Sequence, residues 1–319
     1  MLEFNINYLL ALQNFREAAP PALTYFFLFI SENFSGAFLI LIPPLLYWIY
    51  NKRFGAYVFC SFISASVVNE ICKTIFCVYR PWILSDKLHL EPLAKTTATG
   101  YSMPSGHTAT STATYGALGY TYRRWVWPLV TAIILSLLIA FSRNYLGAHT
   151  LTDVALALII GWGAVIVCDR VYAFLDAHPD KDIALCAGIA VLLIAVSVFV
   201  LIKPYPYDMR DGVLLADPAI MIEDYFKAAG GLIGFMAGRL LERRKIGFSI
   251  EVSVKVKVLR VLSGLIVAGA GYLMIHLLKG AIPGMAYYFI LMSILAFLTF
   301  GGVPALFVWA EKRFAFLQT

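Results

Sequence analysis

Long apolar segments are the feature of this sequence that most limits its fold. A helix needs about 20 mostly apolar residues to cross a bilayer, and nine segments of about that length are present. They lie at 34–50, 55–78, 105–122, 125–142, 150–174, 183–202, 219–241, 257–278 and 285–310. In lipid, only helices and closed barrels satisfy every backbone hydrogen bond. The sequence therefore predicts an all-α fold, a polytopic transmembrane helix bundle.

The composition supports this prediction. Hydrophobic residues make up 61% of the 319 residues and charged residues only 14%, whereas a soluble domain carries about a quarter. The five cysteines have no paired or metal-type spacing, and we expect them to be buried thiols. The net charge of +6 needs no nucleic-acid partner, since arginines beside spans explain it.

The Lys and Arg residues predict the orientation. With nine spans, fifteen of the 25 fall on one side, at the loops after the first, third, fifth and seventh spans and at the C-terminus. Of the other ten, three belong to the motifs described below. Short cytoplasmic loops carry an excess of Lys and Arg, so the richer side is predicted to be cytoplasmic. We expect a bacterial plasma membrane, or an internal membrane in a eukaryote.

Three regions are predicted along the chain. Residues 1–33 are expected to form an interfacial helix over 3–15 and a re-entrant or interfacial apolar segment over 21–31, which is too short to span easily. Residues 34–202 form a six-span core, and 203–319 a membrane extension. In the extension, Gly230, Gly234 and Gly238 make a stripe of small residues suited to close helix packing. We expect packing within the chain, with a homodimer contact as the alternative.

Three polar clusters interrupt the apolar sequence. KTIFCVYRP contains Lys73 and Arg80, MPSGH contains Ser105, Gly106 and His107, and SRNYLGAHTLTD contains Arg143, His149 and Asp153. Each cluster stands at the end of a predicted span. Because the spans alternate in direction, all three are expected at the same, extracytoplasmic face.

The clusters predict an anion site. Lys73, Arg80 and Arg143 are cations near the hydrocarbon boundary, with no matching run of carboxylates in the sequence. Unpaired charge there is costly, so a dianionic ligand is the natural complement, and an Arg fork can hold two phosphate oxygens. Ser105 and Gly106 begin a helix, whose free N–H groups favour anions.

The two histidines predict a reaction. His149 and Asp153 are four residues apart and share a helix face, so the carboxylate can orient the imidazole and stabilise its charged form. His107 is then the candidate general acid. Each residue also has a purely structural interpretation. Lys73 and Arg80 could be anchors at a helix end; Ser105 could be only a helix cap and Asp153 only a capping partner of Thr150. The joint pattern favours the catalytic interpretation.

These clusters resemble the signature of the type-2 phosphatidic acid phosphatase superfamily: K-x6-RP, PSGH and SR-x5-H-x3-D. Every defining position is matched, from Lys73 to Asp153. The resemblance covers about 34–202. It implies a phosphohistidine on His149 oriented by Asp153, with His107 as the acid. It also implies that Lys73, Arg80, Ser105, Gly106 and Arg143 hold the phosphate, without a metal or other cofactor.

The expected function is therefore a membrane phosphatase for a lipid arriving from the bilayer. Candidate substrates are phosphatidate, phosphatidylglycerophosphate, a polyprenyl diphosphate or a sphingoid phosphate. A lipid phosphotransferase and a phosphatase for a soluble sugar phosphate are the nearest alternatives. Vanadium haloperoxidases share the motif but are soluble. A lipid transporter is the alternative from another class; it would place charges at the midplane, whereas here they gather at one face.

Overall fold

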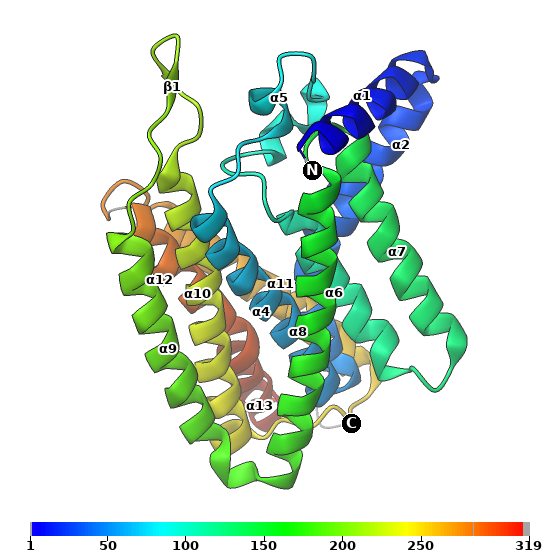
Figure 1. Ribbon diagram of the computed structural model, residues 1–319. Helices are drawn as coiled ribbons and strands as arrows, with labels where there is room; N and C mark the ends of the chain where they lie inside the picture. Colours follow the sequence, from blue (N-terminus) through cyan, green and yellow to red (C-terminus); the bar gives the residue numbers. More distant parts are fainter. Residues whose placement is uncertain (1, 283, 315–319) are drawn as a thin grey trace.

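Helices run side by side through most of the molecule (Figure 1). The computed structural model describes residues 2–282 and 284–314. Among these residues, seven helical segments are long and apolar enough to cross a membrane. The predicted polytopic helix bundle is confirmed, and each of the nine predicted spans coincides with a helix.

The α-helices of the first two thirds of the chain are α1 (Leu2–Ala18), α2 (Pro21–Glu32), α3 (Phe38–Leu45), α4 (Lys52–Phe76), α5 (Pro81–Leu84), α6 (Gly106–Thr121), α7 (Val126–Tyr145), α8 (Leu151–Ala177) and α9 (Asp182–Ile202). The rest are α10 (Pro218–Leu241), α11 (Val254–His276), α12 (Gly284–Phe297) and α13 (Val303–Arg313). The π and 3₁₀ segments are η1 (Asn33–Ala37), η2 (Leu46–Tyr50), η3 (Pro92–Thr97), η4 (Pro179–Lys181), η5 (Glu242–Ile246) and η6 (Leu298–Gly302). A small antiparallel hairpin, β1 (Met209–Arg210) and β2 (Val213–Leu214), pairs Met209 with Leu214.

The central helix, α6, is the least lipid-like of the predicted spans. It has only 16 residues, rich in Thr, Gly and Ala, and it packs against α4, α7 and α8. Small residues let the helices approach closely: a Cβ built at Gly119 would lie 2.6 Å from the Cβ of Ala132. Because α6 is surrounded by protein, its sequence need not be apolar on every face.

The N-terminal region differs from the prediction at one point. Residues 21–31 are not a separate short segment, because α2, η1, α3 and η2 follow one another as a helical run from Pro21 to Tyr50. The run bends at Gly36, whose φ of −115° and ψ of −109° are not helical. The 30-residue run begins next to α1 and ends at Tyr50, whose hydroxyl lies 2.7 Å from that of Tyr122 at the other end of α6. The helix expected over 3–15 is present as α1.

The glycine stripe on α10 packs against another helix of the same chain. A Cβ at Gly230 or Gly234 would collide with the backbone oxygen of Phe289 or Ser293 on α12, and one at Gly238 would lie 2.9 Å from the oxygen of Phe297. The C-terminal extension therefore packs as a tight α10–α12 pair. This stripe is not free to hold a second copy of the chain.

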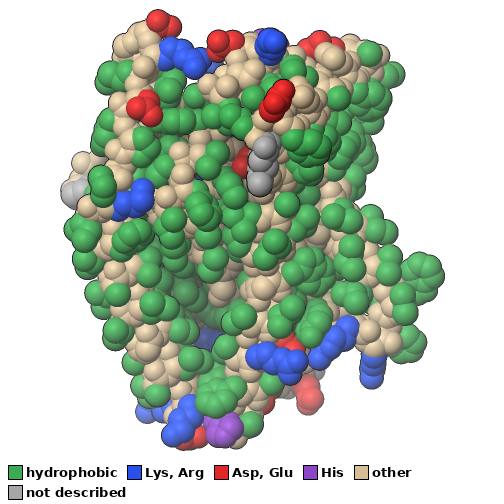
Figure 2. Space-filling model, in the orientation of Figure 1, with side chains coloured by type: hydrophobic (Ala, Val, Ile, Leu, Met, Phe, Trp, Pro, Cys, Tyr) green, Lys and Arg blue, Asp and Glu red, His purple; other side chains and the backbone are tan. Residues whose placement is uncertain are grey.

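The surface agrees with a membrane setting. Figure 2 shows hydrophobic side chains over the middle of the molecule, with charged side chains gathered mainly at its upper and lower ends. Large apolar side chains such as Ile159, Val191 and Ile202 are 67–75% exposed. In water such a surface would be unfavourable, whereas lipid tails are its natural solvent.

Candidate active site

The three polar clusters meet at one end of the bundle. Lys73 lies in the last turn of α4 and Arg143 in the last turn of α7. His107 and Asp153 lie in the first turns of α6 and α8. Because α4 and α7 run towards this end and α6 and α8 start from it, the antiparallel arrangement brings the clusters together (Figure 1).

His149 is held in a defined tautomer. Arg80 donates from Nη1 to its Nε2 over 2.9 Å, and an arginine nitrogen can only donate. The Nε2 atom therefore carries a lone pair and Nδ1 carries the proton. Nδ1 lies 3.5 Å from Oδ2 of Asp153 and 3.4 Å from Oγ of Ser102. The imidazole thus faces a carboxylate on one side and offers a nucleophilic nitrogen on the other.

The position of Asp153 fits both of the roles considered for it. Its Oδ2 accepts from the backbone N–H of Thr150 at 2.8 Å, in a reciprocal capping box at the start of α8. The same oxygen accepts from the Ser102 hydroxyl at 2.6 Å and faces His149. Its Oδ1 is buried and has no partner among the described residues. Capping fixes the carboxylate where it can act on the imidazole.

Arg80 is almost fully buried and is tied to the surrounding backbone. Nε donates to the carbonyl of Gly100 at 3.0 Å, Nη1 to that of Ala148 at 3.0 Å and Nη2 to that of Thr99 at 2.5 Å. Its side chain is therefore fixed by the loop before α6 and the turn before α8. The guanidinium stands directly against Nε2 of His149.

Arg143 is the buried cation with free hydrogen-bond donors. Nη1 donates to Ser31 at 2.6 Å and lies 3.6 Å from Glu32. Its Nε and Nη2 atoms have no partner among the described residues, although the side chain is fully buried. Buried donors without partners are costly, and an anion in this position would satisfy them.

Lys73 and Gly106 lie side by side across α4 and α6. The Lys73 amine is 3.1 Å from Oε1 of Glu70, which also accepts from Asn69 at 3.0 Å. A Cβ at Gly106 would lie 3.7 Å from that amine. Glycine therefore leaves the space beside the cation open to a ligand.

Two carboxylates correct the expectation that the cations lack acidic partners. Glu70 pairs with Lys73, and Glu32 lies 3.6 Å from Arg143. Neither belongs to the motifs, and Glu32 comes from a helix that was not assigned to the core. Their presence lowers the cost of burying the cations, and it leaves Arg80 with no carboxylate within ion-pair distance among the described residues.

Ser105 and His107 differ in how firmly they are held. Ser105 caps α6: its Oγ accepts from the Thr108 N–H at 3.4 Å and from the Thr108 hydroxyl at 3.0 Å. Its own N–H donates to the backbone oxygen of Asp153 at 3.2 Å, joining the starts of α6 and α8. His107 is half-buried, and the charges of Arg143, Lys73 and Arg80 all act on its ring.

The electrostatic environment favours a neutral nucleophile. Burial lowers the pKa of His149 well below its ordinary range, and the charges of Arg80, Arg143 and Lys73 lower it further. The imidazole is therefore uncharged at neutral pH, and its Nε2 lone pair, which accepts from Arg80, becomes nucleophilic when a phosphate oxygen takes over that hydrogen bond. Three cations, a neutral imidazole and the two unpartnered N–H groups of Arg143 are what chemistry on a phosphate group requires.

Sequence comparisons point in the same direction. Residues 54–176 match the PAP2 superfamily, and 226–313 match the PAP2 superfamily phosphatase, transmembrane extension. An undecaprenyl-diphosphatase of Sulfolobus acidocaldarius is 32% identical over 113 residues, covering 35% of this chain and 50% of that protein. Human sphingosine-1-phosphate phosphatase 2 is 25% identical over 178 residues, covering 50% of this chain and 43% of that protein.

A third relative is matched over more of its length. The undecaprenyl-diphosphatase BcrC of Bacillus subtilis is 28% identical over 156 residues, covering 46% of this chain and 76% of that protein. The chain spans half or less of the length of the first two relatives. No solved structure matches the chain.

Proposed function

Because this chain belongs to the PAP2 superfamily, we propose that it is a membrane phosphatase that hydrolyses a lipid phosphate through a phosphohistidine. The observation that carries the proposal is His149, whose Nε2 accepts from Arg80 at 2.9 Å while its Nδ1 faces Asp153 at 3.5 Å. The named relatives act on undecaprenyl diphosphate and sphingosine 1-phosphate. A lipid phosphate monoester or diphosphate is the substrate class that fits both.

In the first step, the Arg80 hydrogen bond moves from Nε2 of His149 to a phosphate oxygen, and Nε2 attacks the terminal phosphorus. The bond from that phosphorus to the leaving oxygen breaks; this is the lipid oxygen of a monoester or the bridging oxygen of a diphosphate. Lys73, Arg80 and Arg143 hold the phosphate oxygens, and Arg143 brings two nitrogens that have no other partner among the described residues. Asp153 stabilises the positive charge that develops on the imidazole. His107 gives its proton to the departing alkoxide or phosphate.

In the second step, water attacks the phosphohistidine and the P–N bond breaks. His107 takes the proton from this water and so returns to its starting state. The products are the lipid alcohol, or the lipid monophosphate from a diphosphate, and inorganic phosphate. The bound dianion offsets the cations around His107 and thereby allows that residue to carry a proton.

We propose that the site faces the extracytoplasmic side, in a bacterial plasma membrane. Most of the Lys and Arg residues outside the motifs belong to the opposite end of the bundle; among them are Arg239 in the last turn of α10, Arg243 just after it and Lys52 at the start of α4. Short cytoplasmic segments carry this excess. A lipid phosphate in the outer leaflet then reaches the site from the side.

The test is phosphate release by the purified protein in detergent or liposomes. The panel holds phosphatidate, phosphatidylglycerophosphate, a polyprenyl diphosphate and a sphingoid phosphate, each with and without an alcohol acceptor. Turnover of at least one lipid, with an acid-labile and base-stable phosphoenzyme, is the expected result. If the phosphoenzyme loses its phosphate only when an acceptor is present, the protein is a phosphotransferase. No turnover of any lipid would reject the proposal.

A further inference from the structure

An apolar cavity separates the motif-bearing core from the C-terminal extension. It has a volume of about 540 Å³ and is lined by α3, α4, α10, α11, α12 and the π segments that follow α3 and α12. Most of its wall is aliphatic or aromatic, including Phe62, Leu265 and Met292. Small-molecule sites commonly have this size and composition.

The charged groups of the cavity lie together. Glu70, Asp224 and Lys227 belong to its lining, and all three come from the half of α4 or α10 that is nearer to the candidate site. Lys227 pairs with Asp224 at 2.6 Å. The cavity therefore has a polar end, and that end points towards the motif cluster.

Glu70 joins the cavity to the phosphate site. Its Oε1 accepts from Lys73 at 3.1 Å, while its Oε2 is buried with no partner among the described residues. One turn earlier on the same helix, Ser66 also lines the cavity. A molecule that fills the cavity would thus have its polar end beside Lys73.

The other end is closed, and one side is open. Trp48 and Thr299 line the far end, where the indole Nε1 donates to the Thr299 carbonyl at 2.9 Å. On the side, Ile40 and Tyr272 belong to the lining and are 65% and 52% exposed. The exposed pair lies where lipid would surround the bundle, between α3 and α11. A chain could enter sideways here without leaving the bilayer.

We propose that this cavity holds the hydrocarbon chain of the lipid phosphate, with the head group at Lys73; this inference rests on the proposed function. Lipid tails are as apolar as the cavity wall, so little hydrophobic free energy is gained by entering it. Its contribution is positioning: a seated chain brings the phosphate to His149. The C-terminal extension thereby determines which hydrocarbon chains the protein accepts.

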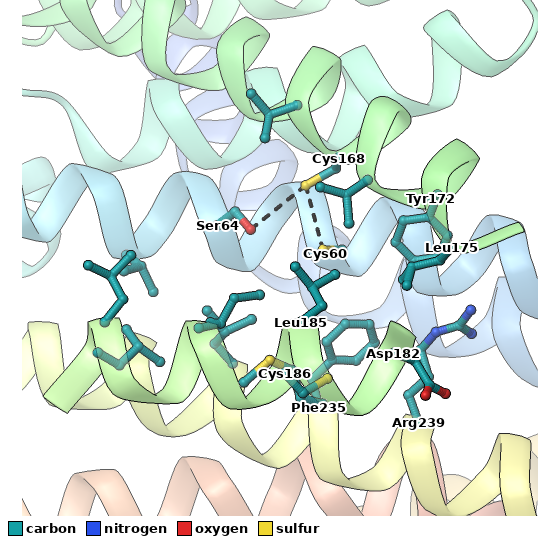
Figure 3. Close-up of a pocket in the computed structure, with 18 of the residues that line it drawn as sticks. Cys60, Ser64, Cys168, Tyr172, Leu175, Asp182, Leu185, Cys186, Phe235 and Arg239 are labelled. Carbon is teal, nitrogen blue, oxygen red and sulfur yellow. Dashed lines mark hydrogen bonds between the residues drawn. The ribbon is translucent and has the colours of Figure 1, made fainter. Parts of the chain in front are cut away.

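A second apolar cavity is the alternative place for the hydrocarbon chain (Figure 3). It lies between α4, α8, α9 and α10, with Cys60, Ser64 and Cys168 on its wall and Asp182 and Arg239 close together at one end. Figure 2 shows a hollow on this face of the molecule. Its charged end is at the start of α9 and the last turn of α10, far along the helices from the motif cluster. Among the described residues, no side chain of its lining bonds to Lys73, Arg80, Arg143 or His149.

The two cavities allow a matched pair of variants. Ser66 and Ser64 lie two residues apart on α4 and face different cavities. Ser66→Phe should lower kcat/KM for a long-chain lipid phosphate at least tenfold and leave p-nitrophenyl phosphate within twofold. Ser64→Phe should leave both substrates within twofold. The soluble substrate also reports whether each variant is folded.

A second pair of variants, on α11 of the C-terminal extension, tests the same cavity. Ala268 on α11 lines the cavity, whereas Ala270 is exposed and outside the lining. Ala268→Trp should shorten the longest lipid chain that is turned over efficiently, and Ala270→Trp should not.

Three results would overturn the inference. The first is an equal loss of activity on long-chain and soluble substrates in Ser66→Phe and Ala268→Trp. The second is no loss of activity in either of these variants. The third is a loss confined to long-chain substrates in Ser64→Phe alone, which would assign the hydrocarbon chain to the second cavity. Wild-type protein that releases no phosphate from any substrate would instead reject the proposed function. The two failures are therefore distinguishable.

Discussion

Replacing Asp153 by asparagine separates the catalytic role proposed for it from its capping role. The side-chain oxygen of asparagine can still accept from the Thr150 N–H, so the start of α8 is retained. What is lost is a negative charge 3.5 Å from Nδ1 of His149. At an effective dielectric constant of about 20, a pair of charges at that separation interacts with about 5 kcal/mol.

That energy sets the size of the effect. The interaction exists only when the imidazole becomes charged, in the attack on phosphorus, so it lowers the barrier without tightening substrate binding. About 1.4 kcal/mol corresponds to a factor of ten in rate, and we expect Asp153→Asn to slow phosphoenzyme formation about 10³-fold. KM should change by less than threefold, because Asp153 does not touch the phosphate.

The assay is a rapid-quench measurement of phosphohistidine formation at saturating substrate. Thr150→Val is the matched control: it removes the hydroxyl that accepts from the Asp153 N–H at 3.3 Å and keeps the carboxylate. The control should cost about 1 kcal/mol of stability with the rate within a fewfold of wild type. If the asparagine variant loses less than tenfold, Asp153 is only a helix cap.

Further outcomes are expected from the same geometry. His149→Ala should abolish turnover while vanadate still binds, and residual turnover above background would reject it as the nucleophile. EDTA should leave the rate unchanged; loss that is restored by magnesium would show that a metal is needed. Since the pKa of His149 is lowered, protonation should stop catalysis only below about pH 6.5, and Arg143→Gln should move that acid limb upward in a pH profile of kcat/KM. Gly234→Leu should force α10 from the Ser293 backbone and cost about 1–3 kcal/mol, seen as a lower midpoint of thermal unfolding.

The sequence predicts the meeting of the motifs because the argument needs only helix lengths and alternation. Spans that end at Lys73 and Arg143 and begin at His107 and Asp153 must share an end of the bundle. Which face of α8 carries His149 and Asp153 follows from their four-residue spacing. These conclusions depend on local periodicity, which is present in the sequence.

Other parts of the site depend on contacts between distant segments. Nothing local identifies Glu32 as a neighbour of Arg143, 111 positions away, or Ser102 as a donor to Asp153. Glu70 could have been found, because it lies one turn before Lys73 on a predicted span, and a carboxylate within a span is a functional signal. Residues 21–31 looked too short to span because the bend at Gly36 hides their continuity with α3.

The contact of Arg143 with Ser31 and Glu32 means that the candidate site is not confined to the part of the chain that matches the PAP2 superfamily. That match begins at residue 54, after both partners, and it also omits Arg16, which donates to the backbone oxygens of Tyr145 and His89 at 2.9 and 2.8 Å. A shortened chain that starts at the match would leave a buried guanidinium without its counter-ion and the end of α7 without its brace. Transplanting this chemistry into another membrane scaffold therefore requires the first two helices as well.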